Sequence, residues 1–291
     1  MKLTAKDLAS RPVQTIAADA DLDRAIDLLD DLKIHHLPVT GRTGKCVGMI
    51  SDRDLLSRVG GIHRRDRIPA HAHDDLPQHV EDIMSIPAIS ATETDDLADV
   101  IDKMLIHRIS AIAIVKGREL WGMVTSRDIL RRYLDDENIP AGKWRFQKVL
   151  ETMTRDVISL RQTDSIDVAV RMFREHAIRH LPIMESGRLV GMLSDRDVRR
   201  VMGTLRAEAA LEEGKAPTRI SVGHVMSAEL VTASAVDTLA DAADRMIAYQ
   251  ITSLPVLEEG KLVGILTESD LMRAFARACR TDKPTTHRAS G

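Results

Sequence analysis

The chain repeats one sequence pattern four times, and this periodicity constrains the fold more than any other feature. The pattern is G-h-h-S/T-x-x-D-h, where h is apolar, and successive copies begin 74, 69 and 73 residues apart. The four copies are GMISDRDL from Gly48, GMVTSRDI from Gly122, GMLSDRDV from Gly191 and GILTESDL from Gly264. A matching block precedes each copy: HHLPV from His35, SAIAI from Ser110, RHLPI from Arg179 and TSLPV from Thr252. Such periodicity indicates one supersecondary unit that is copied and packed against its neighbours.

Each copy predicts the element order β-α-β-β-α. A short strand is expected to end near a hydroxyl residue, which is Thr15, Ser90, Ser159 or Thr232 in the four copies. The spacing of Leu22, Ala25, Ile26 and Leu29 is typical of an amphipathic helix. The runs LPVT and KCVGMI predict two strands, and SDRDLLSRV predicts a second helix. The fold class expected is therefore α/β, built from four βαββα repeats.

The repeats divide the chain into four domains joined by more polar segments. The domains are expected at residues 1–60, 80–134, 147–203 and 219–278, with linkers at 61–79, 135–146 and 204–218. Residues 279–291 are expected to form a disordered tail.

Composition narrows the setting in which the protein works. The net charge of −3 over 291 residues gives no strong attraction to nucleic acid or anionic membranes. The first residues lack a signal-peptide core, and no run of about 18 apolar residues predicts a membrane span. Cys46 and Cys279 lie in no metal or redox spacing. We therefore expect a cytoplasmic protein, and its aromatic content of 2% predicts an aliphatic, methionine-rich core.

The full register of these motifs resembles four CBS (cystathionine-β-synthase) domains arranged as two tandem pairs, known as Bateman modules. The resemblance covers nearly the whole chain. The arrangement of two pairs is similar to that in the nucleotide-sensing gamma subunit of AMP-activated kinase. It implies that two domains pack sheet to sheet, that adenosyl ligands bind in the clefts between them, and that two pairs form a flat disc.

The S/T-x-x-D box is the strongest candidate for ligand contact. Ser51 lies where a strand turns into a helix, and the free N–H groups there favour an anion such as phosphate. Asp54 lies one turn further, and a carboxylate accepts hydrogen bonds from two vicinal hydroxyls such as those of ribose. The phosphate candidates are Ser51, Thr125, Ser194 and Thr267, and the ribose candidates are Asp54, Asp128, Asp197 and Asp270. The alternative is that each box is a helix cap.

Two repeats carry basic residues beside the predicted cleft. His35 and Arg179 precede the h-P step in repeats 1 and 3, whereas Ser110 and Thr252 take that position in repeats 2 and 4. The resemblance implies that this position lies at the phosphate end of the cleft. The neighbouring His36 and His180 predict affinity that depends on pH around neutrality. We therefore expect an anion site in repeats 1 and 3, although these side chains can also be solvated strand ends.

Further candidates are weaker. Arg53, Arg127 and Arg196 lie inside the boxes and are candidates for phosphate or carboxylate contact, or for a solvated surface. Repeat 4 has Glu268 and Ser269 instead, and Glu268 is expected to repel a polyphosphate. Repeat 2 has Ala113 where the other repeats have proline. The resemblance implies that the backbone at Thr15, Ser90, Ser159 and Thr232 lies beside base and phosphate, and the alternative is a turn before a helix.

Other signals do not favour a different chemistry. His63, His71, His73 and His79 crowd one linker, but no acid or cysteine scaffold accompanies them, so no metal site is predicted. The short basic run at 64–67 lacks the aromatic residues that stack on bases. No hydrolase, Walker A or zinc-protease motif is present, so we expect no enzyme and no required cofactor.

The sequence thus predicts a regulatory protein that binds AMP, ADP or ATP. Its output is expected to pass through an unidentified effector protein or through a homodimer. The alternatives are the same clefts with S-adenosylmethionine, NAD or a cyclic dinucleotide, and an interaction scaffold that binds no ligand.

Overall fold

The computed structural model describes residues 3–58, 77–117, 119–135, 144–201 and 220–281. It confirms the α/β fold and the element order of the four repeats. Repeat 1 consists of β1 (Ile16–Ala17), α1 (Leu22–Asp31), β2 (His36–Thr40), β3 (Cys46–Ser51) and α2 (Asp52–Arg58). Repeat 2 consists of β4 (Ser90–Thr92), α3 (Leu97–Ile106), β5 (Ala111–Lys116), β6 (Glu119–Thr125) and α4 (Ser126–Asp135).

The second half of the chain follows the same order. Repeat 3 consists of β7 (Leu160–Arg161), α5 (Ile166–Glu175), β8 (His180–Glu185), β9 (Arg188–Ser194) and helical residues 195–201. Repeat 4 consists of β10 (Ala233–Ser234), α7 (Leu239–Ala248), β11 (Ser253–Glu258), β12 (Lys261–Thr267) and α8 (Glu268–Thr281). Each repeat therefore has its own three-stranded sheet, in which the first two strands are parallel and the last two antiparallel.

The predicted amphipathic helices bury the side chains that their spacing selects. In α1, Leu22, Ala25, Ile26 and Leu29 are all at most 3% exposed. The two long strands of each repeat bury alternate or consecutive apolar residues, and in β2 the three central residues are buried. In repeat 1, sheet and helix thus enclose a small apolar core.

The position of the first strand corrects the sequence prediction. Thr15, Ser159 and Thr232 precede β1, β7 and β10, and Ser90 is the first residue of β4, so the hydroxyl residue does not end the strand. The chain further upstream pairs elsewhere, because backbone bridges join Ser10 and Thr154, five residues before Thr15 and Ser159, to Met123 and Ile265 of the following repeat.

A leading segment with a short 3-10 helix precedes each repeat and packs on the other repeat of its pair. These helices are η1 (Ala5–Asp7), η4 (Val80–Asp82), η6 (Val149–Glu151) and η7 (Val222–His224). Val80 belongs to the core cluster of repeat 1, and Ala5 belongs to that of repeat 2. Repeats 1 and 2 therefore exchange their leading segments and form module 1, and repeats 3 and 4 form module 2 in the same way.

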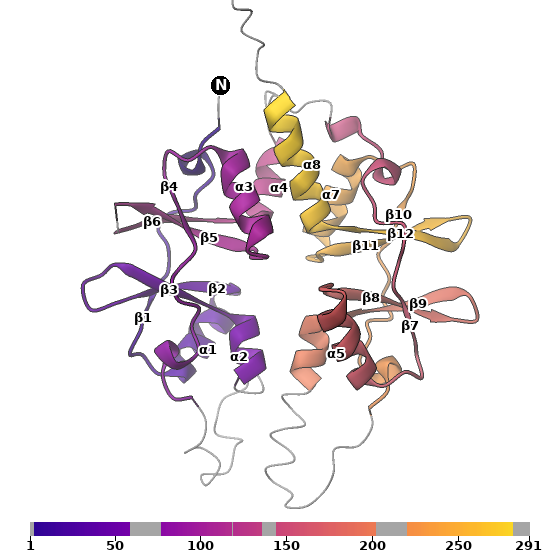
Figure 1. Cartoon of the computed structure of the whole chain (residues 1–291), viewed down its shortest axis with the longest axis horizontal. Coiled ribbons are helices and arrows are strands. Elements are labelled where there is room, and N and C mark those ends of the chain that lie inside the picture. The colour runs from indigo at the N-terminus through magenta and orange to yellow at the C-terminus, as the bar shows by residue number, and fades with distance from the viewer. Residues whose placement is uncertain (1–2, 59–76, 118, 136–143, 202–219, 282–291) are drawn as a thin grey trace, which may run out of the picture.

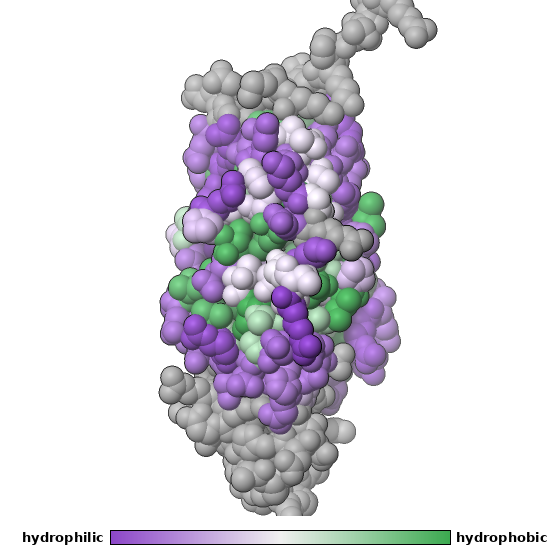
Figure 2. Space-filling model, turned by 90° about the vertical axis from the view of Figure 1, so that its left-hand side faces the viewer, coloured by the Kyte–Doolittle hydropathy of each residue, from purple (hydrophilic) through white to green (hydrophobic). Residues whose placement is uncertain are grey.

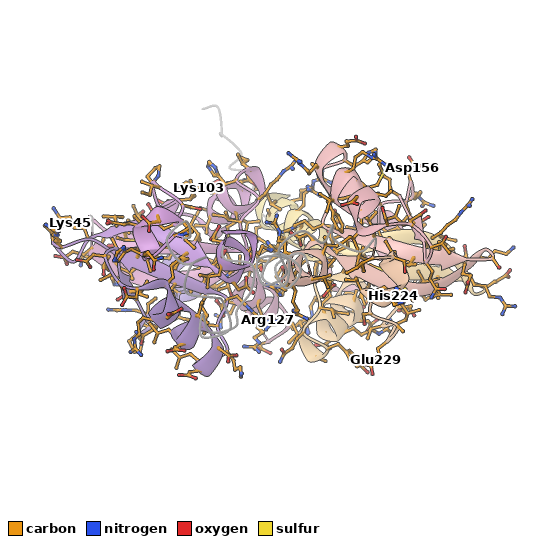
Figure 3. All side chains as sticks on the ribbon, turned by 90° about the horizontal axis from the view of Figure 1, so that it is seen from below. Lys45, Lys103, Arg127, Asp156, His224 and Glu229 are labelled. Atoms are coloured by element: carbon orange, nitrogen blue, oxygen red, sulfur yellow. The ribbon has the colours of Figure 1, made fainter. Side chains whose placement is uncertain are left out.

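The four repeats lie around a common centre, in a broad and flat arrangement (Figures 1 and 3). Repeats 2 and 4 meet on one side through α3, α4, α7 and α8, which we call the even-side contact. Repeats 1 and 3 meet on the other side through α2 and the helix from residue 195, which we call the odd-side contact. Arg127 lies near the middle of the molecule and Lys45 at its outer end (Figure 3).

The buried cores differ between the two sides. One apolar cluster spans repeats 2 and 4, whereas the cores of repeats 1 and 3 are separate clusters. At the outer edge of module 1, apolar side chains gather midway along the face that carries the strand hairpins (Figure 2). A backbone bridge between Lys45 and Glu119 joins the two hairpins there.

Most of the predicted linkers lie outside the described residues, and so does most of the predicted tail. Where the structure does describe these ranges, Trp144–Phe146 form the 3-10 helix η5, and α8 continues to Thr281. His63, His71 and His73 also lie outside the described residues. Within the described part of the chain, no helix has the length and apolar character needed to cross a membrane.

Candidate functional site

The four S/T-x-x-D boxes share one geometry. In each, the hydroxyl residue ends a strand and the aspartate lies in the first turn of the following helix. The hydroxyl donates to aspartate Oδ2 at 2.5–2.6 Å, and the backbone N–H of the same residue donates to that oxygen at 2.8–3.0 Å. The aspartate N–H donates back to the hydroxyl at 3.2–3.4 Å. Every box is therefore a capping box, and all eight side chains remain partly exposed.

The glycine that opens each box accommodates the leading segment of the other repeat. A Cβ added to Gly48 would lie 2.8 Å from Met84 Sδ and 2.9 Å from the Ser85 carbonyl oxygen. Gly191 and Gly264 meet Met226 and Met153 in the same way, at 2.4 and 2.5 Å. The motif glycine is thus required by the exchange of leading segments, which one repeat considered alone does not reveal.

In repeat 4 the box carboxylate has an additional partner. Asp270 Oδ1 accepts from Arg273 Nη1 at 2.9 Å, so both of its oxygens are engaged. The cap and this ion pair together hold the carboxylate at the start of α8.

Asp52 connects the two modules at the odd-side contact. Its side chain is 7% exposed, and its Oδ2 accepts from His35 Nδ1 at 3.0 Å and lies 2.8 Å from Arg196 Nη2 of repeat 3. Burial alone would raise the pKa of Asp52, but the hydrogen bond from His35 and the charge of Arg196 outweigh it and lower the pKa. Asp52 is therefore a buried carboxylate held by a histidine of its own module and by an arginine of the other module.

A second pair mirrors the first. Arg53 Nε lies 4.0 Å from Asp195 Oδ2, and Arg199 Nε approaches the same oxygen at 3.6 Å. Burial lowers the pKa of Arg53, and the charges of Arg179 and Arg196 lower it further. The carboxylate of Asp195 acts in the opposite direction and raises this pKa. The guanidiniums of Arg53, Arg179 and Arg196 thus lie close enough to repel one another. Among the described residues, the buried Nε atoms of Arg53 and Arg196 have no hydrogen-bond acceptor.

His36 and His180 correct the predicted pH dependence. His36 Nε2 forms a 3.3 Å hydrogen bond with Ser110 Oγ, and His180 Nε2 forms a 2.9 Å bond with Thr252 Oγ1. Burial lowers the pKa of both imidazoles to about 4. They are therefore neutral near pH 7, and the expectation that they titrate around neutrality is wrong, because they join the two repeats of a module instead of facing solvent.

The equivalent residues at the even-side contact include fewer cations than the group around Asp52 and Asp195 at the odd-side contact. Glu268 and Ser126 take the positions of Asp195 and Asp52, and Ser269 replaces the arginine of the box. Burial raises the pKa of Glu268, and the Ser126 hydroxyl and the Arg127 charge act against that rise. Arg127 therefore lies beside a carboxylate of the opposite module, as Arg53 and Arg196 do.

The hydroxyl residues before the first strands have different surroundings in odd and even repeats. The carbonyl oxygen of Thr232 accepts from Arg245 Nη1 at 3.0 Å, and that of Ser90 accepts from Lys103 Nζ at 3.5 Å. Leu28 and Met172 take the positions of these cations around Thr15 and Ser159. In repeats 2 and 4 the polar backbone of this series is thus satisfied within the repeat.

Comparison with known proteins agrees with this architecture. The CBS domain model matches residues 5–61, 80–135, 148–204 and 222–277, which is most of the chain. The protein therefore belongs to the CBS-domain family, with two Bateman modules in one chain.

Particular relatives extend over nearly all of the chain. Protein MJ1225 of Methanocaldococcus jannaschii is 27% identical over 278 residues, which are 92% of this chain and 96% of the relative. The CBS domain-containing protein YhcV of Bacillus subtilis is 36% identical over 123 residues, 42% of this chain and 81% of the relative. The crystal structure of MJ1225 superposes with a TM-score of 0.74 at 24% identity, covering 94% of this chain and 100% of that one. This likeness shows the same four-repeat fold.

Proposed function

We propose that the protein is a regulatory module that binds an adenine nucleotide (AMP, ADP or ATP) in the clefts of repeats 1 and 3. The observation that carries this proposal is the group of three guanidiniums, from Arg53, Arg179 and Arg196, beside the boxes Ser51–Asp54 and Ser194–Asp197. Asp52 pairs with Arg196 and Asp195 with Arg53, and Glu268 is a third carboxylate, whose charge interacts with Arg53 and Arg179. An anion placed here gains a cation cluster and two helix N-termini together.

The capping boxes are compatible with ligand contact. The cap uses Oδ2 of Asp197, and we assign the other oxygen to the ribose hydroxyls. The hydroxyl of Ser194, the side chain of Arg179 and the opposite His35 then face the phosphate end. The same roles in repeats 2 and 4 fall to Thr125, Asp128, Thr267 and Asp270, where fewer cations and the carboxylate of Glu268 favour weaker phosphate binding.

Ligand binding would act through the odd-side contact. A phosphate near Arg196 competes with Asp52 for the same guanidinium, and a phosphate near Arg53 competes with Asp195. Nucleotide and inter-module ion pairs are therefore energetically coupled, and the difference in affinity between the paired and unpaired states sets the size of the response. We propose that an effector protein, or a second copy of the chain, reads this change.

Further observations support a regulatory role over a catalytic one. The matched residues belong entirely to CBS domains, and the fold neighbour MJ1225 is described as a proposed archaeal homologue of γ-AMPK. The box hydroxyls serve as caps for helices. We further propose a cytoplasmic location, since neither Cys46 nor Cys279 is in a disulfide.

Isothermal titration calorimetry with AMP, ADP, ATP and S-adenosylmethionine tests the proposal. We expect binding of at least one nucleotide, with loss of at least about 10-fold in affinity in the double variant Asp54→Asn, Asp197→Asn. The matched control is Asp128→Asn, Asp270→Asn, which removes the same capping carboxylate charges from repeats 2 and 4.

Three outcomes would contradict parts of the proposal. Absence of heat with every nucleotide would indicate a scaffold that binds no ligand. Binding of S-adenosylmethionine alone would exclude the phosphate assignment. Equal losses in the two double variants would show that the odd repeats have no special role.

A further inference from the structure

An exposed apolar surface lies on module 2, where the leading segment of repeat 3 runs beside the turn that follows β10. Phe146, Leu150 and Val236 are 76%, 38% and 65% exposed, and we call these three side chains the Phe146 patch. The two segments that carry them are adjacent, because the Leu150 N–H donates to the Ala235 carbonyl at 3.0 Å. Lys148 crosses between the segments, and its Nζ donates to the Val236 carbonyl at 2.9 Å. Its aliphatic stem therefore extends the apolar surface.

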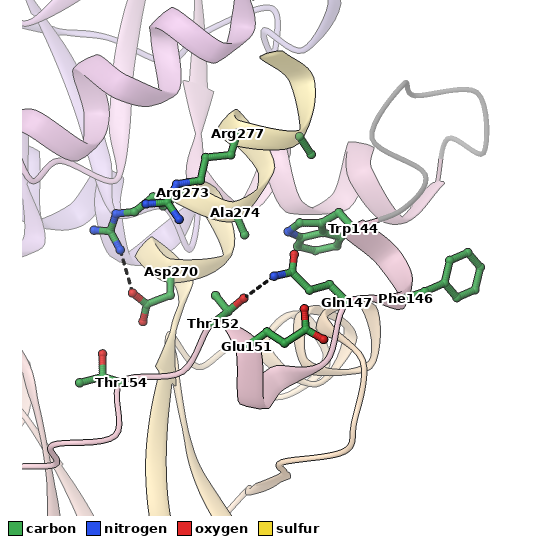
Figure 4. Close-up of a pocket in the computed structure, with 11 residues that line it drawn as sticks. Trp144, Phe146, Gln147, Glu151, Thr152, Thr154, Asp270, Arg273, Ala274 and Arg277 are labelled. Atoms are coloured by element: carbon green, nitrogen blue, oxygen red, sulfur yellow. Dashed lines mark hydrogen bonds and ion pairs between the residues drawn. The ribbon is translucent and has the colours of Figure 1, made fainter. Parts of the chain in front are cut away.

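A fixed base holds Phe146 in solvent. Trp144 of the same 3-10 helix is 2% exposed and packs edge-to-face on Tyr133, with ring centroids 4.1 Å apart. Between the two residues of η5, Arg145 Nη2 donates to the Leu134 carbonyl at the end of α4, at 2.9 Å. Phe146 points away from this cluster and from α8 (Figure 4). An aromatic side chain held out by a fixed backbone is typical of a contact residue, because little conformational entropy is lost when it is covered.

The other three repeats lack this surface. The backbone bridge Lys148–Thr238 has a counterpart in each of them, and these bridges align the four leading segments. The positions equivalent to the Phe146 patch hold no large apolar residue: they are Lys2, Lys6 and Thr94 beside repeat 2, Pro77, Glu81 and Asp19 beside repeat 1, and Arg219, Gly223 and Thr163 beside repeat 3. The repeated fold therefore does not require the patch, and a group of exposed apolar side chains at one of four equivalent surfaces indicates a contact.

Side chains can cover the patch, but an added strand cannot pair with it. The carbonyl of Leu150 already accepts from Arg155 Nη2 at 3.1 Å, and that of Val236 accepts from Lys148. The N–H groups of Leu150 and Val236 are also bonded within the module. Strand addition needs free backbone donors and acceptors, so the patch suits a partner that offers another set of apolar side chains.

The charges at the rim of the patch suit a second copy of the same surface. Lys148 and Glu151 lie three residues apart, and both are exposed. Their charges cancel, and a twofold axis would set Lys148 of each copy against Glu151 of the other. The equivalent surface beside repeat 1 carries Asp19 and Glu81, which would repel their own copies in such a contact.

The size of the patch sets the strength of the contact. The three side chains together expose roughly 300 Å2, since one aromatic side chain buries about 150–250 Å2 when it is fully covered. A stable interface buries about 800 Å2 on each partner, and smaller interfaces are weak and transient. A second copy seated on the patch should therefore bind reversibly and only at high protein concentration.

We infer that the Phe146 patch is the contact surface of a weak, twofold-symmetric dimer of this chain. Phe146 of each copy packs on Leu150 and Val236 of the other, and the pairs of Lys148 with Glu151 flank the apolar contact. The surface includes none of the residues assigned to nucleotide binding, so the dimer does not depend on the proposed function.

Sedimentation velocity of the full-length protein without nucleotide tests the inference. Between about 5 and 500 µM, the weight-average mass should rise from the 32.3 kDa of one chain toward twice that value. Phe146→Lys, which introduces the residue of module 1, should raise the Kd of the dimer by about 10-fold or more. Because Phe146 is exposed, this variant should keep its fold, which circular dichroism checks. The matched control is Ile106→Lys at the end of α3, where Ile106 is 75% exposed, and it should leave the dimer unaltered.

Exchange of the rim charges provides a second measurement. Lys148→Glu should weaken the dimer, because it sets two carboxylates against each other, and the double variant Lys148→Glu, Glu151→Lys should restore it. The inference is overturned if the protein stays monomeric over the whole concentration range, which would leave the patch to an apolar segment of an effector. It is also overturned if Phe146→Lys dimerises as tightly as Ile106→Lys, or if the double charge variant dimerises no better than Lys148→Glu.

Discussion

The even-side and odd-side contacts join the same two modules by different physical means. On the even side, the rings of Tyr133 and Phe275 meet edge-to-face at 3.9 Å within one apolar core. On the odd side, Asp52 and Arg196 form a partly buried ion pair between cores that remain separate. Apolar burial is insensitive to small ions, whereas an ionic contact responds to salt, pH and competing anions. The even side therefore holds the modules together, and the odd side is the part that the proposed nucleotide would alter.

The largest effect is expected from breaking the even side. Phe275→Ala should lower the free energy of unfolding by about 3–5 kcal/mol, because it leaves a cavity where both modules contribute to one core. Urea denaturation followed by circular dichroism measures this loss. We also expect Phe275→Ala to uncouple the unfolding of the two modules. Leu55→Ala, a core change confined to repeat 1, should lower the free energy of unfolding without uncoupling the modules. A single cooperative transition in both variants would contradict the assignment of the even side as the main link.

A smaller effect is expected from breaking the odd side. Arg196→Ala should cost about 1–2 kcal/mol of unfolding free energy, because the buried carboxylate of Asp52 then loses its guanidinium partner and keeps the hydrogen bond with His35. A double-mutant cycle with Asp52→Asn isolates the pair, and its coupling energy should fall as salt rises. Coupling that is absent at low salt would show that the pair does not link the modules.

The dependence of stability on pH should also distinguish repeats 1 and 3, which carry His36 and His180, from repeats 2 and 4. The pKa of His36 and His180 is about 4 in the folded protein and roughly 6.5 in an unfolded chain. Between these pH values the unfolded state binds more protons, so these residues make stability fall as pH falls from about 6.5 to 4. His36→Ala with His180→Ser introduces the residues of the even repeats, Ala111 and Ser253, and should flatten this part of the pH–stability curve. An unchanged slope in urea midpoints across this range would contradict the lowered pKa values.

The smallest effect is expected at the rim of the even side. Arg280 of α8 pairs with Asp99 and Asp102 of α3, and its side chain is 43% exposed. Exposed ion pairs contribute little, so Arg280→Ala should change stability by less than about 1 kcal/mol, measured by urea denaturation. A loss as large as that of Arg196→Ala would remove the distinction between rim and buried ion pairs.

The repeated fold could be predicted from sequence because its signals are local. The apolar spacing of Leu22 to Leu29 and the strand runs around Gly48 define elements within a single repeat. The box residues also lie only three positions apart, so their proximity follows from helix geometry.

The remaining features depend on contacts between distant segments. The prediction placed Thr15 at the end of a strand, because nothing in PVQTI shows that Ser10 bridges to Met123 of repeat 2. The partnership of Asp52 with Arg196, and the burial of His36 against Ser110, likewise join residues that only the assembled repeats bring together. Trp144 and Phe146 lay in a range interpreted as linker, although they belong to η5 and Trp144 is one of only two tryptophans in the chain.

The exchange of leading segments makes the module, and not the repeat, the smallest autonomous unit. A fragment that holds repeat 1 without Val80 and Met84 would expose the groove at Gly48 and lack part of its core. Duplication of this architecture during evolution should therefore have proceeded in pairs of repeats. A cut within residues 136–143 should yield two halves that stay associated through the core that repeats 2 and 4 share, whereas a cut between repeats 1 and 2 should yield chains that fold only when mixed.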